Sequence, residues 1–309
     1  MEEKAKKKSS KKGDDPKELF LSFGGSELQG RRSTMEDVTV SLKNSKLAFF
    51  GVFDGHGGRR AADHCAKNLH KHLLAEPALK EKRYKKAIRN AFLQTDSEFC
   101  QQAQDRKWRD GSTAAIVLLK YDRAKTTRER RRLLLVANVG DTRVVACRQG
   151  KAKPLTVDHK PLTERERIEK YGGCILGGNV NGVLAVSRAI GDVELKPGRP
   201  IQDNPVTAQP DVWKYEVTDD LEFLLLACDG VWDVFSNDDA VKVVRKALKR
   251  NGGDANAAAE ALTNEAYERK STDNISALVV VLNPLMRKSE GSQRRRSSLE
   301  PRKEDEANN

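Results

Sequence analysis

Cysteine is scarce in this chain, which has five cysteines among its 309 residues. The five are widely separated and include no CxxC pair, so neither a disulfide framework nor a zinc site is expected. Such usage fits a reducing compartment. Cys147 and Cys228 lie in apolar runs, where a thiol usually acts as a small core hydrophobe.

Long hydrophobic runs are absent as well. No apolar stretch approaches the roughly 20 residues that a membrane-spanning helix needs. The N-terminal segment is highly charged and lacks the apolar core of a secretory signal, and Glu2 follows Met1 where N-myristoylation needs glycine. We therefore expect a soluble protein without membrane insertion, located in the cytoplasm, the nucleus or both.

Positive charge is in excess, with a formal net charge of +12. The excess is concentrated in the runs Lys4–Lys12, Arg123–Arg132 and Arg294–Arg296, and the remaining chain is closer to balance. This distribution is typical of tails and a loop, not of a folded nucleic-acid-binding face. A nucleic-acid partner is therefore not expected, although binding through basic tails stays open as an alternative.

Composition divides the chain into three parts. Residues 1–18 and 285–309 are rich in charged residues and serine and are predicted to be disordered tails. Residues 19–284 form a continuous body without a linker, and are predicted to be one catalytic domain, expected to be a monomer. The whole chain is 38% hydrophobic, which is enough for a sizeable core.

Both tails carry short basic motifs. The stretch KAKKKSSKK at 4–12 is either a nuclear-import signal or a solubilising tail. In RRRSS at 294–298, arginines precede serines as basophilic kinases prefer, which gives the hypothesis that Ser297 or Ser298 is phosphorylated.

Hydrophobic periodicity predicts strands in groups and helices in pairs. Strands are expected at 46–53, 113–119, 133–139, 142–147, 221–228 and 275–282, and helices at 58–74, 81–100, 237–249 and 254–269. The stretch 163–166 (TERE) is typical of a capping box at a further helix start. Grouped strands and paired helices favour an α+β fold with mostly antiparallel sheets covered by helices.

Two hydrophobic strands end in the same dipeptide, Asp54-Gly55 and Asp229-Gly230. If the strands lie side by side, the two carboxylates meet, and like charges at short range need a cation between them. Oxygen ligands favour magnesium or manganese over zinc. The alternative is that each Asp-Gly pair is a hairpin turn, although the first leads into a helix. Further acidic residues add to the pattern, and several of them lie where a predicted strand begins or ends; they are Glu36, Asp37, Asp141, Asp233 and Asp273.

Nine blocks of the sequence, in order and covering essentially all of residues 23–282, resemble the metal-dependent protein phosphatases of type 2C. The blocks are GRRSTMED (30–37), FDGHGG (53–58), DGSTA (110–114), ANVGDTR (137–143), LTVDHKP (155–161), RIEKYGG (167–173), VNGVLAVSRAIGD (180–192), ACDGVWDV (227–234) and STDNISALVV (271–280). The resemblance implies a central antiparallel β-sandwich flanked by helices on both outer faces, a four-layer αββα arrangement.

The resemblance also implies a metal centre with two Mn²⁺ or Mg²⁺ ions. In it Asp54 bridges the two cations, Gly55 offers its carbonyl oxygen, and Asp229 and Asp273 complete one coordination shell. Glu36 and Asp37 match acidic residues that hold metal-bound waters. Asp141 and Asp233, together with Asp229, match a third, looser metal position.

Two further residues gain roles from the resemblance. Arg32 matches an arginine that binds the substrate phosphate, and His56 matches the general acid that protonates the leaving oxygen. The implied activity is hydrolysis of phosphoserine and phosphothreonine in phosphoprotein substrates, by direct attack of a water activated by the two metals. The alternative is a catalytically inactive scaffold, a pseudophosphatase of the same fold. His159 and Arg188 are expected to be structural.

Overall fold

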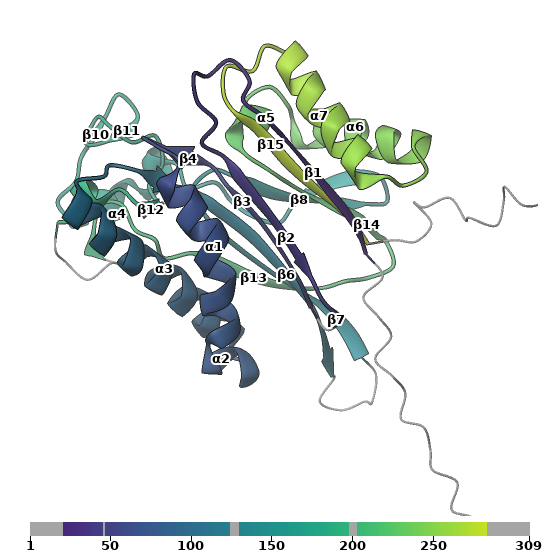
Figure 1. The fold of residues 1–309 in the computed structure, drawn as a ribbon, viewed down its shortest axis with the longest axis horizontal. Helices are drawn as coiled ribbons and strands as arrows, with labels where there is room; N and C mark the ends of the chain where they lie inside the picture. The colour runs from purple at the N-terminus through teal and green to yellow at the C-terminus, as the bar shows by residue number, and fades with distance from the viewer. Residues whose placement is uncertain (1–20, 46, 124–129, 198–202, 283–309) are drawn as a thin grey trace, which may run out of the picture.

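The computed structural model describes residues 21–45, 47–123, 130–197 and 203–282 (Figure 1). Both predicted tails lie outside these described residues, and so do Ser297, Ser298 and the tip of the basic loop.

Two antiparallel five-stranded sheets form the centre of the molecule, with strand orders β1-β15-β14-β8-β9 and β13-β7-β6-β3-β2. The first sheet consists of β1 (Ser22–Leu28), β8 (Arg143–Arg148), β9 (Lys151–Pro154), β14 (Leu221–Ala227) and β15 (Ile275–Val281). The second consists of β2 (Val38–Lys43), β3 (Leu47–Phe53), β6 (Ala114–Arg123), β7 (Arg130–Val139) and β13 (Asp211–Glu216).

Helices cover both outer faces of this sandwich, as Figure 1 shows. The second sheet is covered by α1 (Arg60–Ala75), α2 (Pro77–Lys80) and α3 (Tyr84–Arg106). The first sheet is covered by α6 (Asn237–Arg250) and α7 (Ala255–Glu268). The predicted α+β class with four αββα layers is confirmed. No helix in the described ranges is long and apolar enough to cross a membrane.

Strand β3 shows why the layers form. Side chains alternate between the two faces of a strand, and here both faces are apolar. Phe49 and Phe53 pack into the core beneath α1 and α3, while Phe50 and Val52 pack into the core between the sheets. The dense apolar run is therefore explained by burial on both faces.

Smaller elements surround one end of the sandwich. They include a three-stranded sheet of β4 (Gly55–His56), β5 (Gly111–Ser112) and β12 (Ile190–Gly191), and the short helix α5 (Asp229–Trp232). The segment between β9 and β13 adds η1 (Pro161–Glu164), α4 (Arg165–Lys170), β10 (Ile175–Leu176), β11 (Asn179–Val180) and η2 (Val193–Leu195).

Several predicted boundaries are wrong, for local reasons. Helix α1 begins at Arg60 and not at 58, because Gly57 and Gly58 have positive φ angles of 67° and 136°. The basic run Arg123–Arg132, expected to be a loop, lies partly in strands, since β6 continues to Arg123 and β7 begins at Arg130.

The predicted capping box at 163–166 is also wrong. Residues 161–164 form a 3-10 turn, and the side chain of Thr163 donates a hydrogen bond backward to the Lys160 carbonyl at 2.8 Å. Helix α4 begins only at Arg165, without a side-chain cap. Glu164 instead accepts hydrogen bonds from Arg188, Arg167 and Ser187. Charge-assisted bonds in a partly buried network outweigh a single helix cap.

This network lowers two pKa values. Burial alone would raise the pKa of Glu164, but hydrogen bonds and charge from Arg188 lower it to about 2. A hydrogen bond from His159 and the charge of Arg188 lower the pKa of Asp211 to about 2. Both carboxylates bind protons more weakly in the folded state than in the unfolded chain. Their stabilising contribution is therefore present above about pH 4.5 and is lost as the pH falls toward 2.

We predict that Glu164→Gln lowers the free energy of unfolding by about 2 kcal/mol at pH 6, with the deficit shrinking as the pH falls from about 4.5 to 2. Urea unfolding of both proteins across this range measures the difference. Glu169→Gln is the matched control, because the Glu169–Arg165 pair is about half exposed. A Glu164→Gln deficit that does not change with pH would contradict the network's role.

Candidate metal and phosphate site

The acidic residues predicted from the sequence meet at one end of both sheets. Asp37 directly precedes β2 and Asp54 directly follows β3, and these strands pair with Val38 opposite Phe53. In the other sheet Asp229 follows the end of β14, and Asp273 lies just before β15. The sandwich therefore brings together carboxylates that are up to 236 residues apart in the chain.

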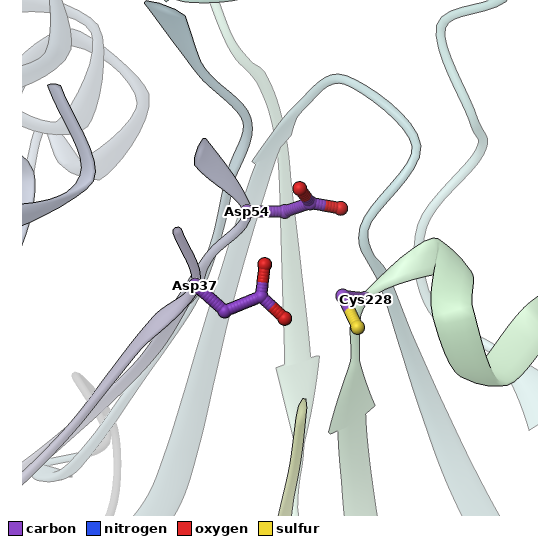
Figure 2. Close-up of side chains that lie close together, drawn as sticks. All are labelled: Asp37, Asp54 and Cys228. Atoms are coloured by element: carbon purple, nitrogen blue, oxygen red, sulfur yellow. The ribbon is translucent and has the colours of Figure 1, made fainter. Parts of the chain in front are cut away.

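Asp37 and Asp54, which we call the centre of this group, lie close together beside Cys228 (Figure 2). A ligand atom from each, together with the Cys228 sulfur, lies within 4.8 Å of the others. Asp37 is only 1% exposed, and both of its carboxylate oxygens are buried without a hydrogen-bond partner among the described residues. Buried polar atoms are nearly always paired in native proteins, so these oxygens indicate a ligand that bonds to oxygen.

Electrostatics gives the same indication. Burial raises the pKa of Asp54 well above its ordinary value, and the negative charges of Asp37 and Asp229 raise it further. Burial likewise raises the pKa of Asp37 to about 6, with Asp273 adding to the rise. Burial and the charge of Asp141 raise the pKa of Asp229 to about 7. Carboxylates held this close repel one another, and divalent cations would relieve that repulsion.

Cys228 lies in the group but does not fit as a ligand. Burial raises the pKa of its thiol well above the ordinary value, and the nearby aspartates raise it further, so the thiolate that binds metals is disfavoured. Its sulfur accepts a hydrogen bond from the Ser276 amide and the thiol donates one to the Asn274 carbonyl. The remaining ligands are oxygens, which fits magnesium or manganese. The predicted core role of Cys228 agrees with its packing between the sheets.

Neither Asp-Gly pair is a hairpin turn. Gly55 lies in β4, and Gly230 lies in α5. A Cβ atom at Gly55 would come within 2.5 Å of the Glu36 carbonyl oxygen, and one at Gly230 within 2.0 Å of the Asn274 carbonyl oxygen. The glycines thus allow two other segments of the site to approach the strand ends closely.

Buried polar residues hold the segments in register. The Thr113 amide donates to the Asp54 carbonyl at 2.9 Å, and the Thr113 hydroxyl accepts from the Asp54 amide at 3.2 Å. Asn274 accepts from the Glu36 amide and donates to the carbonyls of Gln29 and Thr34. It therefore ties the loop that precedes Asp37 to the start of β15. This role of Asn274 is not visible in the sequence, because it depends on the pairing of distant segments.

Two basic side chains neutralise carboxylates at the rim. Arg32 Nη2 lies 2.5 Å from Asp273 Oδ2, and Lys160 Nζ lies 2.5 Å from Asp141 Oδ2. The Arg32 side chain is 58% exposed, so its guanidinium is accessible to a phosphate group. Glu36 accepts hydrogen bonds from the Thr34 hydroxyl and the Gly58 amide.

Asp233 lies one helical turn beyond Asp229, at the exposed end of α5. The negative charges of Asp229 and Asp233 oppose each other, and that repulsion adds to the rise in the pKa of Asp229. Asp233 is thus on the outer side of the acidic group.

His56 has a partner that the sequence analysis missed. Its Nε2 lies 2.9 and 3.0 Å from the two carboxylate oxygens of Asp192, which is 8% exposed. Burial alone would lower the pKa of His56, but the charge and hydrogen bond of Asp192 outweigh it and raise the pKa. The sequence block around Asp192 gave no sign of this contact, since it depends on the three-stranded sheet.

Gly111 makes the contact between His56 and Asp192 possible. It lies opposite His56 on one side and opposite Gly191 on the other. A Cβ atom at Gly111 would come within 2.2 Å of both His56 Nε2 and Asp192 Oδ2. The missing side chain leaves the space in which imidazole and carboxylate meet.

His159 has structural partners, as expected, and so does His72. His159 is buried, accepts a hydrogen bond from the Gly140 amide at Nδ1, and contacts Asp211 through Nε2. His72 contacts Thr95 and Glu98 on helix α3, an acidic partner that the sequence did not reveal.

Comparisons with known proteins agree with this geometry. Residues 21–275 match the family model described as Protein phosphatase 2C. The chain is 44% identical over 269 residues to "Probable protein phosphatase 2C 11" of Arabidopsis thaliana, which covers 84% of this chain and 66% of that protein. It is 42% identical over 270 residues to "Probable protein phosphatase 2C 55" of Oryza sativa subsp. japonica, covering 84% and 65%. The chain therefore spans just under two thirds of the length of these relatives.

Solved structures share the fold. A phosphatase from a pathogenic strain of Toxoplasma gondii superposes with a TM-score of 0.74 at 28% identity, covering 86% of this chain and 94% of that one. A sex-determining protein of C. elegans gives 0.73 at 27% identity, covering 85% and 65%. The chain belongs to the protein phosphatase 2C family.

We predict that Gly111→Ala, which forces His56 and Asp192 apart, lowers the pKa of His56 relative to the wild type, because the raising effect of Asp192 is lost while burial still lowers the pKa. NMR titration of the imidazole in chelator measures this shift. Ser112→Ala, one residue along the same strand, is the control and should leave the pKa unchanged. An unaltered His56 pKa in Gly111→Ala would contradict the assigned pairing.

Proposed function

We propose that this chain is a metal-dependent protein serine/threonine phosphatase, which hydrolyses phosphoserine and phosphothreonine by direct attack of water without a covalent phosphoenzyme. The observation that carries the proposal is the Asp37–Asp54 pair: both Asp37 carboxylate oxygens are buried without a hydrogen-bond partner among the described residues, and the pKa values of both carboxyl groups are raised. Membership of the protein phosphatase 2C family supports the same activity.

Four carboxylates would hold the cations: Asp54 at the centre, Asp37 beside it, and Asp229 and Asp273 from the other sheet. The Gly55 carbonyl is a further candidate ligand. This donor set fits two Mn²⁺ or Mg²⁺ ions, because it is rich in oxygen and its negative charge is unbalanced. When bound, such cations supply Lewis acidity, which lowers the pKa of water toward neutrality.

Arg32 would bind the phosphoryl group. Its planar guanidinium can form two parallel hydrogen bonds to phosphate oxygens, and it lies at the rim of the acidic group beside Asp273. The group's negative charge repels a phosphate, so a cationic side chain at the entrance helps to orient the substrate.

His56 would act as the general acid. Asp192 accepts a hydrogen bond from Nε2 and raises the pKa of the imidazole, which favours the protonated ring that a general acid needs. In the imidazolium the second ring nitrogen, Nδ1, carries the proton that can pass to the leaving serine or threonine oxygen. Asp192 thus has the role of orienting and charging His56.

Replacing Asp229 by asparagine tests the metal assignment through both activity and stability. We predict that Asp229→Asn removes most Mn²⁺-dependent turnover of a phosphopeptide, because one anionic ligand is lost. In chelator the same variant should be more stable than the wild type by about 2 kcal/mol at pH 8.

The pH dependence of this gain has a definite sign. The folded pKa of Asp229, about 7, lies above its ordinary value of 3.8, so ionisation costs stability as the pH rises from about 4 to above 7. The advantage of Asp229→Asn should therefore grow through that window. Wild-type activity in Asp229→Asn at saturating Mn²⁺ would refute the assignment. A wild type without any Mn²⁺-dependent turnover would favour the inactive scaffold.

A second test addresses the general acid. We predict that His56→Gln slows hydrolysis of a phosphoserine peptide by about 10²-fold or more, while an activated aryl phosphate is affected much less. An alkoxide leaving group needs a proton and a phenolate with a low pKa does not. Steady-state kinetics on both substrates with Mn²⁺ gives the comparison, and equal losses would count against the role of His56.

A further inference from the structure

Lys160 is placed where a cation could bind. Its Nζ lies 2.5 Å from Asp141 Oδ2, and the Asp141 side chain is only 5% exposed. The Lys160 side chain remains 46% exposed, so its ammonium can also leave toward solvent. The buried Asp141 carboxylate is thus paired with a lysine side chain that can also extend into solvent.

The charge of Lys160 acts on several carboxylates at once. Burial lowers the pKa of Lys160, but the negative charge of Asp141 outweighs it, and Asp229 adds to the resulting rise. In turn the ammonium opposes the rise in the pKa values of Asp229 and Asp233. Lys160 therefore balances the charge on one side of the acidic group, the side that Asp141, Asp229 and Asp233 share.

The backbone holds this pair in place. The His159 amide donates to the Gly140 carbonyl at 3.0 Å, and the Gly140 amide donates to His159 Nδ1 at 3.2 Å. These bonds fix the residues that immediately precede Lys160 and Asp141. The Lys160 carbonyl accepts from the amide and hydroxyl of Thr163, which anchors the following turn. The lysine is therefore part of a defined structure and not a free surface side chain.

We propose that Lys160 is an internal counter-cation, which competes with a divalent cation for the side of the acidic group formed by Asp141, Asp229 and Asp233. A cation that enters there must displace the ammonium from Asp141. Lys160 thereby weakens binding of the outermost cation and leaves the Asp37–Asp54 centre to fill first. This inference rests on the proposed metal-dependent function and deepens it, because it assigns a residue that sets the order and affinity of loading.

Calorimetric titration of the metal-free full chain with Mn²⁺ tests the competition. In Lys160→Met, which keeps the side-chain length without the charge, the weakest Mn²⁺ site should tighten by about tenfold or more, because charge repulsion is removed. Lys160→Arg keeps the charge and should resemble the wild type. Lys170→Met, at an exposed position on α4, is the matched control. Asp141→Asn combined with Lys160→Met should abolish the gain.

The outcomes separate this inference from the proposed function. If the wild type binds two Mn²⁺ ions tightly and the weak site is unchanged in Lys160→Met, the proposed competition by Lys160 is overturned. The proposed metal-dependent function would stand. A wild type that binds no Mn²⁺ would overturn both proposals.

A measurement on the wild type does not depend on folding of any variant. Acetylation of lysines by a water-soluble reagent, quantified by mass spectrometry, reports how free each amine is. Saturating Mn²⁺ should raise the labelling rate of Lys160 several-fold relative to Lys170, because the ammonium is released from Asp141. An unchanged ratio would overturn the proposal.

Discussion

Repulsion among buried carboxylates is the constraint on which this site depends. Asp37 and Asp54 lie side by side at the ends of paired strands, and Asp229 adds a third negative charge from the opposite sheet. Burial removes the water that would screen these charges, so their pKa values rise and the metal-free site is destabilised near neutral pH. The protein can hold this strained group only because two well-packed sheets fix the strand ends.

The surrounding structure neutralises the negative charge at the rim of the acidic group and not at its centre. Within the part of the chain that the structure describes, no basic side chain pairs with Asp37 or Asp54, whereas Arg32 pairs with Asp273 and Lys160 pairs with Asp141. The two rim residues have different consequences in our proposals. Arg32 is available to bind a phosphate, and Lys160 opposes a further cation. In these proposals, charge at the rim controls what enters, and the divalent metal binds at the centre.

Close backbone approach is the second condition for the site. Gly55 and Gly230 allow neighbouring carbonyls to come near the strand ends, and Gly111 leaves the space in which His56 reaches Asp192. At each of these positions the absence of a Cβ atom leaves the space that the close approach needs. The same substitution, glycine to alanine, would therefore disturb the acidic group at two positions and the contact between His56 and Asp192 at the third.

The sequence alone determined the layers of the fold and the identity of the acidic residues. Apolar runs such as 46–53 and 221–228 predict buried strands. A strand that ends in aspartate and glycine places a carboxylate at a sheet edge. Helix starts were less certain: Gly57 and Gly58 delay α1, and Glu164 joins a tertiary ion network in place of a helix cap. Local sequence patterns cannot reveal that a tertiary contact will replace a helix cap, because the residue that makes the contact lies elsewhere in the chain.

Only the tertiary structure decided the pairings. His56 meets Asp192, Asn274 ties down the loop before Asp37, and Lys160 meets Asp141, each through backbone segments that are brought together by the sheets. The type of a residue and its spacing along the chain indicate which metal ligands, basic groups and proton donors the protein has. Which charge faces which, and therefore every shifted pKa, depends on distances that exist only after the strands have paired.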